Sequence, residues 1–134
     1  MKAVIDTNVI ISSVLSPQGK PAEIMKLFDT GKLQLIYTVD ILDEYKRVLG
    51  YKKLNIIERT QLDLVISLQT RGTLAAEPPT STIPLTDESD RKFYDAAKAN
   101  GAVLITGNQK HYPDEFFVMN PADFLEQMSP TYPT

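Results

Sequence analysis

The chain has 134 residues, and its shares of 43% hydrophobic and 23% charged residues are typical of one globular domain with a single core. It contains no cysteine and one histidine, which excludes disulfides and thiolate metal sites and argues against a multi-histidine zinc site. The net charge of −3 argues against a surface coated in positive charge for binding nucleic acid.

The sequence contains no run of eighteen apolar residues, so we expect no membrane span. The start, MKAVIDTN, reaches a charged residue too early for a signal peptide. We therefore expect a cytoplasmic protein with one domain over residues 1–128 and a short frayed tail over residues 129–134.

Predicted strands and helices alternate along the chain. In chain order, the patterns predict a buried strand over 2–8, a loop over 16–21, a helix over 21–31, a strand over 33–38, helices over 40–51 and 55–72, a weak strand over 73–77, a loop over 77–84, a helix over 87–101, strands over 102–108 and 116–121, and a helix over 121–128. This alternation predicts a single-domain three-layer α/β/α sandwich with a mostly parallel central sheet.

Asp6 stands between apolar residues in the segment VIDTNVIIS. A charge buried inside a strand without a partner would be costly, whereas Asp6 at the end of the first strand would face a cleft. In parallel α/β sheets, ligands bind beyond the carboxyl ends of the strands. We therefore expect Asp6 at that edge.

Helical periodicity indicates which other acids can approach Asp6. In the helix over 40–51, Glu44 lies at the margin of the apolar stripe, whereas Asp40 and Asp43 lie well outside it. Glu44 can therefore direct its carboxylate into a cleft. An ordinary boundary glutamate is the alternative interpretation.

Asp90 occupies the inward face at the start of the helix over 87–101, and Asp95 points to the opposite side. The strand over 102–108 ends in Thr106 and Asn108, much as the first strand ends in Asp6. These polar residues are therefore expected to converge on one cleft.

Three converging carboxylates would repel one another by roughly 4 kcal/mol per pair at 4 Å and an effective dielectric constant near 20. Mg²⁺ or Mn²⁺ would turn them into a cage of hard oxygen ligands. Such an ion orients water and stabilises charge on a phosphoryl group. Metal-assisted phosphodiester cleavage is therefore the predicted reaction class.

From VIDTNVIIS through ILDEYKRVL and DESDRKFYDAAKANGAVLITGN to NPADFL, the chain resembles the PIN-domain (PilT N-terminal) nucleases, and in particular the VapC-like toxins of prokaryotic toxin–antitoxin systems. The resemblance implies a parallel α/β/α sandwich and endoribonuclease activity that depends on Mg²⁺ or Mn²⁺. It also implies an RNA substrate, a homodimer and a neutralising antitoxin.

The resemblance assigns the catalytic and metal-binding acids to Asp6, Glu44 and Asp90. It assigns supporting roles to Asn8 and Thr106, which match polar positions beside the first aspartate and the metal-associated water. A fourth acid of the family is here Asn108, which offers an oxygen but no charge. This departure puts a second metal ion in doubt.

Basic residues are concentrated between Lys46 and Arg59, in a segment with five bases and the single acid Glu58. Such a run is usually a solvated face, but it can also form a rim that contacts phosphates. Candidate RNA phosphate contacts are Lys20, Arg47, Lys92 and Lys110.

The histidine and three of the tyrosines are expected to have ordinary structural roles. His111 is expected to be solvated or bonded locally, with a phosphate contact as the alternative. Tyr37, Tyr51 and Tyr112 are expected to serve in packing or in a dimer contact rather than in base stacking.

Two other functions are compatible with the pattern. Because Asn108 replaces an acid, the domain could instead be a catalytically degenerate module that binds RNA or protein. Alternatively, Asp6 could be the nucleophile of a phosphatase resembling the haloacid dehalogenases, but Asn8 occupies the place of the second aspartate that this chemistry needs.

Overall fold

The computed structural model describes residues 1–129. The elements in chain order are β1 (Lys2–Ile5), α1 (Thr7–Leu15), α2 (Lys20–Asp29), β2 (Gln34–Tyr37), α3 (Val39–Leu49), η1 (Lys52–Leu54), α4 (Glu58–Arg71), β3 (Thr73–Leu74), η2 (Glu88–Asp90), α5 (Arg91–Asn100), β4 (Val103–Ile105), η3 (Gln109–His111), β5 (Val118–Met119) and α6 (Pro121–Met128). Within residues 1–129, no helix has the length and apolarity needed to cross a membrane.

The strands form one five-stranded sheet in the order β3-β2-β1-β4-β5, and every neighbouring pair is parallel. The chain order reverses between β1 and β4, which pair in the register Ile5 with Ile105. Such a reversal is the switch point at which parallel α/β sheets bind ligands. The residues that follow Ile5 and Ile105 therefore lie side by side at this point.

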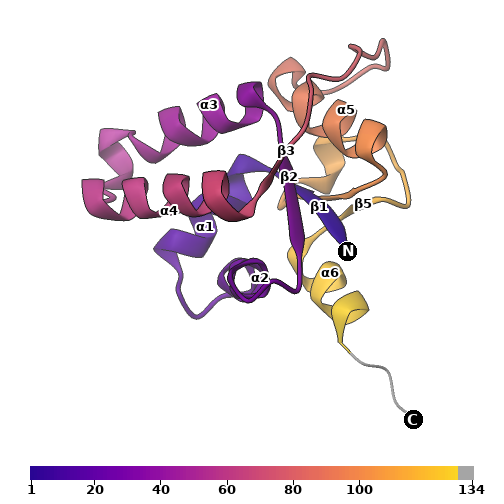
Figure 1. Ribbon diagram of the computed structural model, residues 1–134. Helices are drawn as coiled ribbons and strands as arrows, with labels where there is room; N and C mark the ends of the chain where they lie inside the picture. Colours follow the sequence, from indigo (N-terminus) through magenta and orange to yellow (C-terminus); the bar gives the residue numbers. More distant parts are fainter. Residues whose placement is uncertain (130–134) are drawn as a thin grey trace.

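Helices flank the sheet on both sides (Figure 1). In that view α1, α2, α3 and α4 lie to the left of the sheet and α5 lies to its right, and α3 and α4 form a projecting antiparallel pair. The prediction of an α/β/α fold with a parallel central sheet is therefore confirmed.

The core centres on β1, whose residues Ala3, Val4 and Ile5 are completely buried. A strand covered by helices on both faces reads as a continuous apolar run, which explains the sequence AVI. Gly72 connects α4 to β3 at close quarters: a Cβ there would lie 2.4 Å from the carbonyl oxygen of Leu68. Only glycine fits this junction without a shift of the backbone.

Two sequence predictions differ from the structure. The strand predicted over 2–8 ends at Ile5, and residues 7–15 form helix α1, which the sequence did not predict, because the apolar run after Asp6 is equally typical of a strand. The single helix expected over 87–101 is divided into η2 and α5. Of the expected frayed tail, residues 130–134 lie outside the described residues, and the boundary of the domain stays a prediction.

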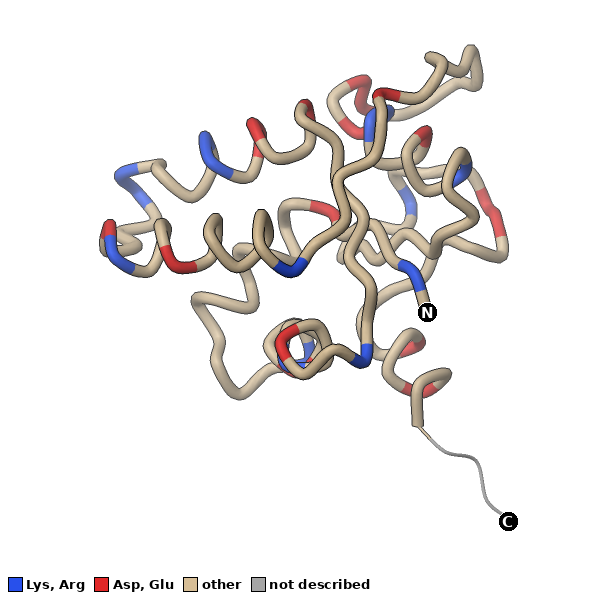
Figure 2. Tube along the Cα trace, in the orientation of Figure 1, with Lys and Arg blue, Asp and Glu red and all other residues tan. Residues whose placement is uncertain are grey.

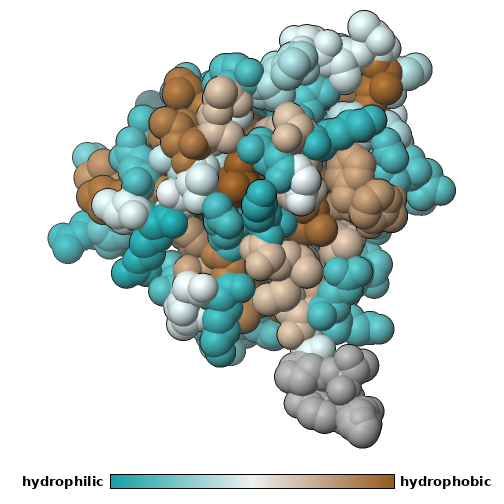
Figure 3. Space-filling model, turned by 45° about the vertical axis from the view of Figure 1, so that its right-hand side comes forward, coloured by the Kyte–Doolittle hydropathy of each residue, from teal (hydrophilic) through white to brown (hydrophobic). Residues whose placement is uncertain are grey.

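The surface carries one concentration of basic residues and several exposed apolar side chains. The basic residues between Lys46 and Arg59 lie along the later part of α3 and around the tip of the α3–α4 pair (Figure 2). Large apolar side chains remain exposed on α4 at Leu62 and Ile66, and before β5 at Phe116, which is 92% exposed. On the face drawn in Figure 3, hydrophobic patches are interrupted by hydrophilic residues.

Candidate functional site

Asp6 lies at the switch point, between the end of β1 and the start of α1. Its backbone is extended, and its amide donates to the carbonyl oxygen of Ile105 at 2.9 Å. The residue is 5% exposed. Oδ2 accepts hydrogen bonds from the Thr106 hydroxyl at 2.8 Å and from the Tyr112 hydroxyl at 2.9 Å. These bonds hold the carboxylate in one orientation.

Burial raises the pKa of Asp6 above its ordinary value. The hydrogen bonds from Thr106 and Tyr112 lower the pKa, and the negative charge of Glu44 raises it. The net rise means that the charged form is under-stabilised by the surrounding residues. A cation beside Asp6 would stabilise the charged form of its carboxylate.

Glu44 approaches the same region from α3 and is 12% exposed. The Thr7 hydroxyl donates to Oε2 of Glu44, and Nζ of Lys92 lies 2.7 Å from Oε1. Arg47 is more distant, with Nη2 at 3.8 Å from Oε1. Glu44 therefore lies between α1 and α5 with both of its oxygens engaged.

The position of α3 is set by contacts at each side of Glu44. Thr38 caps the helix by accepting from the amide of Ile41 at 3.2 Å. The hydroxyl of the buried Tyr45 donates to the carbonyl oxygen of Ile5, and its ring lies 6.4 Å from that of Phe93 on α5. These contacts dock α3 against the end of β1 and against α5.

Asp90 is the last residue of η2, directly before α5, and its side chain is 14% exposed. Burial, followed by the charges of Asp6 and Asp87, raises the pKa of Asp90 to about 6, and His111 opposes this rise. The His111 ring nitrogen Nδ1 lies 3.6 Å from Oδ2 of Asp90. Asp90 is thus electrostatically coupled to Asp6 across the site.

Asp6, Glu44 and Asp90 are neighbours, but they do not form a preassembled cage. Within residues 1–129, no three His, Asp or Glu side chains lie close enough together, in their present conformations, to hold a metal ion. The acids come from three separate elements. Metal binding would therefore require side-chain movement.

The supporting residues lie around the ends of β1 and β4. Asn8 accepts the amide of Gly107 at 3.2 Å, which ties α1 to the loop after β4. Thr106 accepts the amide of Asn108 at 3.0 Å. The side chain of Asn108 is exposed, and its expected contact with a metal stays a prediction.

The four candidate phosphate contacts occupy different places. Lys92 and Arg47 lie at Glu44, as described above. Lys110 belongs to η3, the short turn beside the site, and is exposed. Lys20 is exposed at the first residue of α2. Lys92 is therefore an ion-pair partner of an acid in this structure, and not a free surface cation.

Sequence reasoning gave no role to Thr7, expected His111 to be solvated or bonded locally, and expected Tyr112 to serve in packing or a dimer contact, whereas the structure places all three against the acids of the site. Thr7 is the first residue of α1, a helix that the sequence pattern did not predict, and His111 and Tyr112 follow the Thr-Gly-Asn strand end by a few residues. That proximity to a polar strand end was the available signal for both of them.

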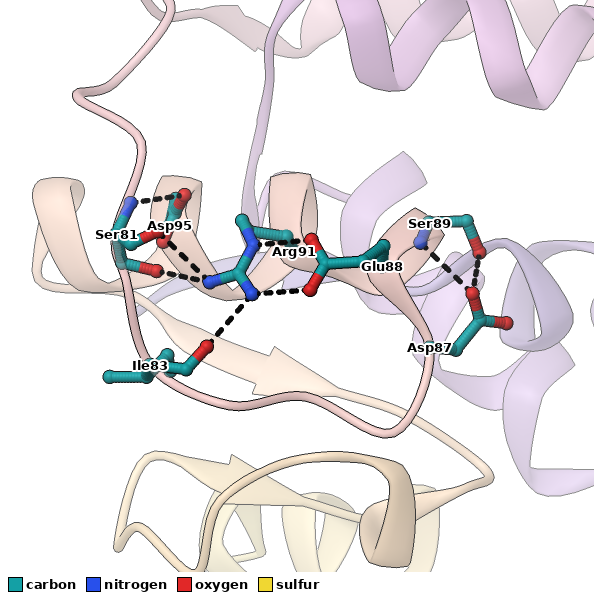
Figure 4. Close-up of polar contacts among 7 residues, drawn as sticks. All are labelled: Ser81, Ile83, Asp87, Glu88, Ser89, Arg91 and Asp95. Carbon is teal, nitrogen blue, oxygen red and sulfur yellow. Dashed lines mark hydrogen bonds and ion pairs between the residues drawn. The ribbon is translucent and has the colours of Figure 1, made fainter.

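A second polar cluster holds the loop that leads to Asp90 (Figure 4). Arg91 donates to the carbonyl oxygens of Ser81 and Ile83 at 3.0 and 2.8 Å, and it pairs with Glu88 at 2.6 Å. Asp95, expected on the side of the helix opposite to Asp90, is buried and accepts the amide of Ser81 at 3.1 Å. These contacts fasten the loop to α5.

Comparisons with known proteins agree with this architecture. A protein-family model described as "PIN domain" matches residues 2–110. The uncharacterised protein MJ1680 of Methanocaldococcus jannaschii is 30% identical over 115 residues, which make up 81% of this chain and 72% of that protein. A crystal structure of VapBC2 from Rickettsia felis, bound to a DNA fragment from its promoter, has a TM-score of 0.61 at 15% identity and covers 90% of this chain and 97% of that one. The chain belongs to the PIN-domain family.

Proposed function

We propose that this protein is a metal-dependent endoribonuclease that hydrolyses RNA phosphodiester bonds and acts as the toxin of a toxin–antitoxin system. The observation that carries the proposal is the position of Asp6. It is a buried carboxylate at the switch point of the sheet, oriented by Thr106 and Tyr112 and coupled to the charges of Glu44 and Asp90.

The available donors suit Mg²⁺ or Mn²⁺. Asp6, Glu44 and Asp90 offer hard carboxylate oxygens, which these ions prefer. Burial, followed by neighbouring negative charges, raises the pKa values of Asp6 and Asp90, so a bound cation would stabilise their ionised forms. When bound, such an ion would orient water and stabilise the charge that builds on the phosphoryl group during attack.

The chain's own residues would position the ion and the substrate. Thr106 and Tyr112 hold Asp6 in place, and Thr7 orients Glu44. His111, beside Asp90, carries a ring N–H that can donate to a phosphate oxygen. The exposed basic residues on η3 and α3, Lys110 and Arg47, can bind flanking phosphates.

RNA as substrate and toxin as role rest on the family membership and on the likeness to VapBC2. The Rickettsia felis structure is a VapBC2 assembly, which supports an antitoxin as partner. The exposed apolar residues on α4, Leu62 and Ile66, offer surface for a protein contact such as a homodimer. The partner itself would be sought in the adjacent reading frame, as a short DNA-binding protein.

The direct test is cleavage of RNA by purified protein with Mn²⁺, with EDTA, and with three variants, Asp6→Asn, Glu44→Gln and Asp90→Asn. Cleavage should require the metal and should be lost in each variant. The exposed neighbour Asp43 provides a matched control, since Asp43→Asn removes the same charge from α3 outside the site. If Asp6→Asn cleaved RNA at the parental rate with saturating Mn²⁺, the proposed mechanism would be wrong.

A catalytically degenerate binding module is the second candidate. Its supporting observation is that, in the part of the chain the structure describes, the three acids are not already assembled as a metal cage. Such a module would bind RNA or a partner protein without cleavage and without a strong requirement for Mn²⁺.

A further inference from the structure

Lys92 is the second residue of α5, and its ammonium group lies inside the acidic site. Nζ is 2.7 Å from Oε1 of Glu44 and donates at 2.7 Å to the carbonyl oxygen of Ser89. The lysine side chain is 18% exposed. An ion pair this short and this sheltered differs from a mobile surface pair, whose partners are mostly hydrated.

With this pairing, both oxygens of Glu44 have a close partner. Its second oxygen accepts the Thr7 hydroxyl, so the carboxylate has a hydrogen-bonding partner on each side. A divalent ion that binds Glu44 has to compete with an ammonium group already in place. Binding the ion without moving Lys92 would bring two like charges together beside one carboxylate, and such a contact is repulsive.

A place for the displaced ammonium lies next to the site. Lys92 also lines a pocket of about 260 Å³ whose walls include the acids Asp40, Glu77, Glu88 and Asp95. Arg91 lines it too, but it already pairs with Glu88, which leaves three acids to receive the ammonium. A long, flexible lysine side chain can turn toward these carboxylates while its backbone stays in α5. The move would exchange one acidic environment for another.

We propose that Lys92 is an internal counter-cation of the site: it neutralises Glu44 in the metal-free protein and has to leave Glu44 when a divalent ion binds. This inference rests on the proposed metal-dependent function. Lys92 stabilises the metal-free state and lowers the affinity for the metal. The site is then half-occupied at a higher concentration of the ion than it would be without Lys92.

The test is calorimetric titration of Mn²⁺ into the parent, Lys92→Met, Lys92→Arg and Lys98→Met. Lys98 is an exposed residue on the same helix, so its substitution removes the same charge outside the site. Lys92→Met should bind Mn²⁺ at least about tenfold more tightly than the parent, because a competing like charge has been removed. Lys98→Met and Lys92→Arg should stay within about twofold of the parent, since the first leaves the site intact and the second keeps its charge.

Thermal melting adds a readout that a purely structural lysine would not produce. Without metal, Lys92→Met should melt at a lower temperature than the parent, and saturating Mn²⁺ should reverse that order. A lysine with a merely structural role would leave the variant less stable in both conditions. That result would overturn the proposal.

A measurement on the parent chain covers the case in which Lys92→Met does not fold. In nitrogen-15 NMR of the lysine ammonium groups, the chemical shift of the Lys92 signal should change when Mg²⁺ is added, because the ammonium leaves Glu44 for other surroundings. A Lys92 signal that is unchanged at saturating Mg²⁺ would contradict displacement.

The failures of the two proposals are distinguishable. If the parent binds Mn²⁺ and Glu44→Gln abolishes binding, but Lys92→Met binds no more tightly than the parent, the role of Lys92 is overturned and the metal site stands. If the parent shows no binding that depends on Glu44, both proposals are overturned together.

Discussion

The hydroxyl of Tyr112 donates a 2.9 Å hydrogen bond to Oδ2 of Asp6, a residue 106 positions earlier in the chain. Both side chains are buried, and the Thr106 hydroxyl binds the same oxygen. Tyr112 thus acts as a positioning residue for Asp6. Burial and the nearby charge of Asp6 raise the pKa of Tyr112 far above its ordinary value, which keeps its hydroxyl protonated as a donor.

Tyr112→Phe should destabilise the protein by about 1–3 kcal/mol, because the buried carboxylate loses one of its two hydroxyl donors. It should also lower the rate of RNA cleavage, since Asp6 loses part of its fixed orientation. Urea unfolding and a cleavage assay measure the two effects. Tyr51→Phe removes a hydroxyl from an exposed tyrosine, so its stability and activity should stay at parental values. Equal behaviour of the two variants would contradict the role given to Tyr112.

The metal-free protein should lose stability through Asp90 as the pH rises. The pKa of Asp90 is about 6 in the folded protein, above the ordinary aspartate value of 3.8, so the folded state holds this proton more tightly than the unfolded state. The stabilising contribution of this proton to the free energy of unfolding is complete below about pH 4 and is lost as the pH rises through about 6. The stability of Asp90→Asn relative to the parent should therefore increase over this interval.

Urea unfolding at pH 4, 5, 6 and 7 in EDTA checks this difference. Asp43→Asn, with its exposed carboxyl, should show no comparable trend. If the difference in free energy of unfolding between Asp90→Asn and the parent were constant from pH 4 to pH 7, the pKa of Asp90 would not be raised in the folded protein. Adding Mn²⁺ should reduce the pH dependence of the parent, because the ion stabilises the ionised carboxylate.

Arg91 should matter through the loop that it fastens (Figure 4). It donates to the carbonyl oxygens of Ser81 and Ile83 and pairs with Glu88. Arg91→Met should lower the melting temperature by several degrees and increase proteolytic cleavage between residues 76 and 87, because these acceptors lose their donor. Arg59→Met is the matched control, since Arg59 is 83% exposed. Identical melting and proteolysis of the two variants would contradict this function of Arg91.

Much of the fold follows from the sequence pattern. The apolar run of β1, the stripe of α3 and the polar ends of β1 and β4 are enough to predict a parallel α/β/α sandwich and to place Asp6 at its edge. Helix α1 was not predicted because VIIS is rich in β-branched residues and lies shortly after a strand. Length and periodicity therefore did not distinguish a helix from a continued strand.

The contacts of the site were less predictable. Which side chain meets Asp6 depends on how residues far apart in the sequence pack, and no local pattern relates Tyr112 to Asp6. Lys92 illustrates the same limit. Its position suggested a phosphate contact, but the approach of α3 to α5 brings it to Glu44. Periodicity gives the face on which a residue lies, and tertiary packing selects its partner.

The central claim, that Asp6, Glu44 and Asp90 together bind a divalent ion, is tested most directly by calorimetric titration of Mn²⁺ into the parent, Asp6→Asn and Asp43→Asn. The parent and Asp43→Asn should bind with the same affinity, and Asp6→Asn should bind at least about tenfold more weakly, because one charged ligand is lost.

Asp6→Asn should stay folded, with a metal-free melting temperature equal to or above that of the parent, since the neutral amide removes a buried charge and its oxygen still accepts from Thr106 and Tyr112. A parent that binds no Mn²⁺, or an Asp6→Asn variant that binds it as tightly as the parent, would contradict the claim.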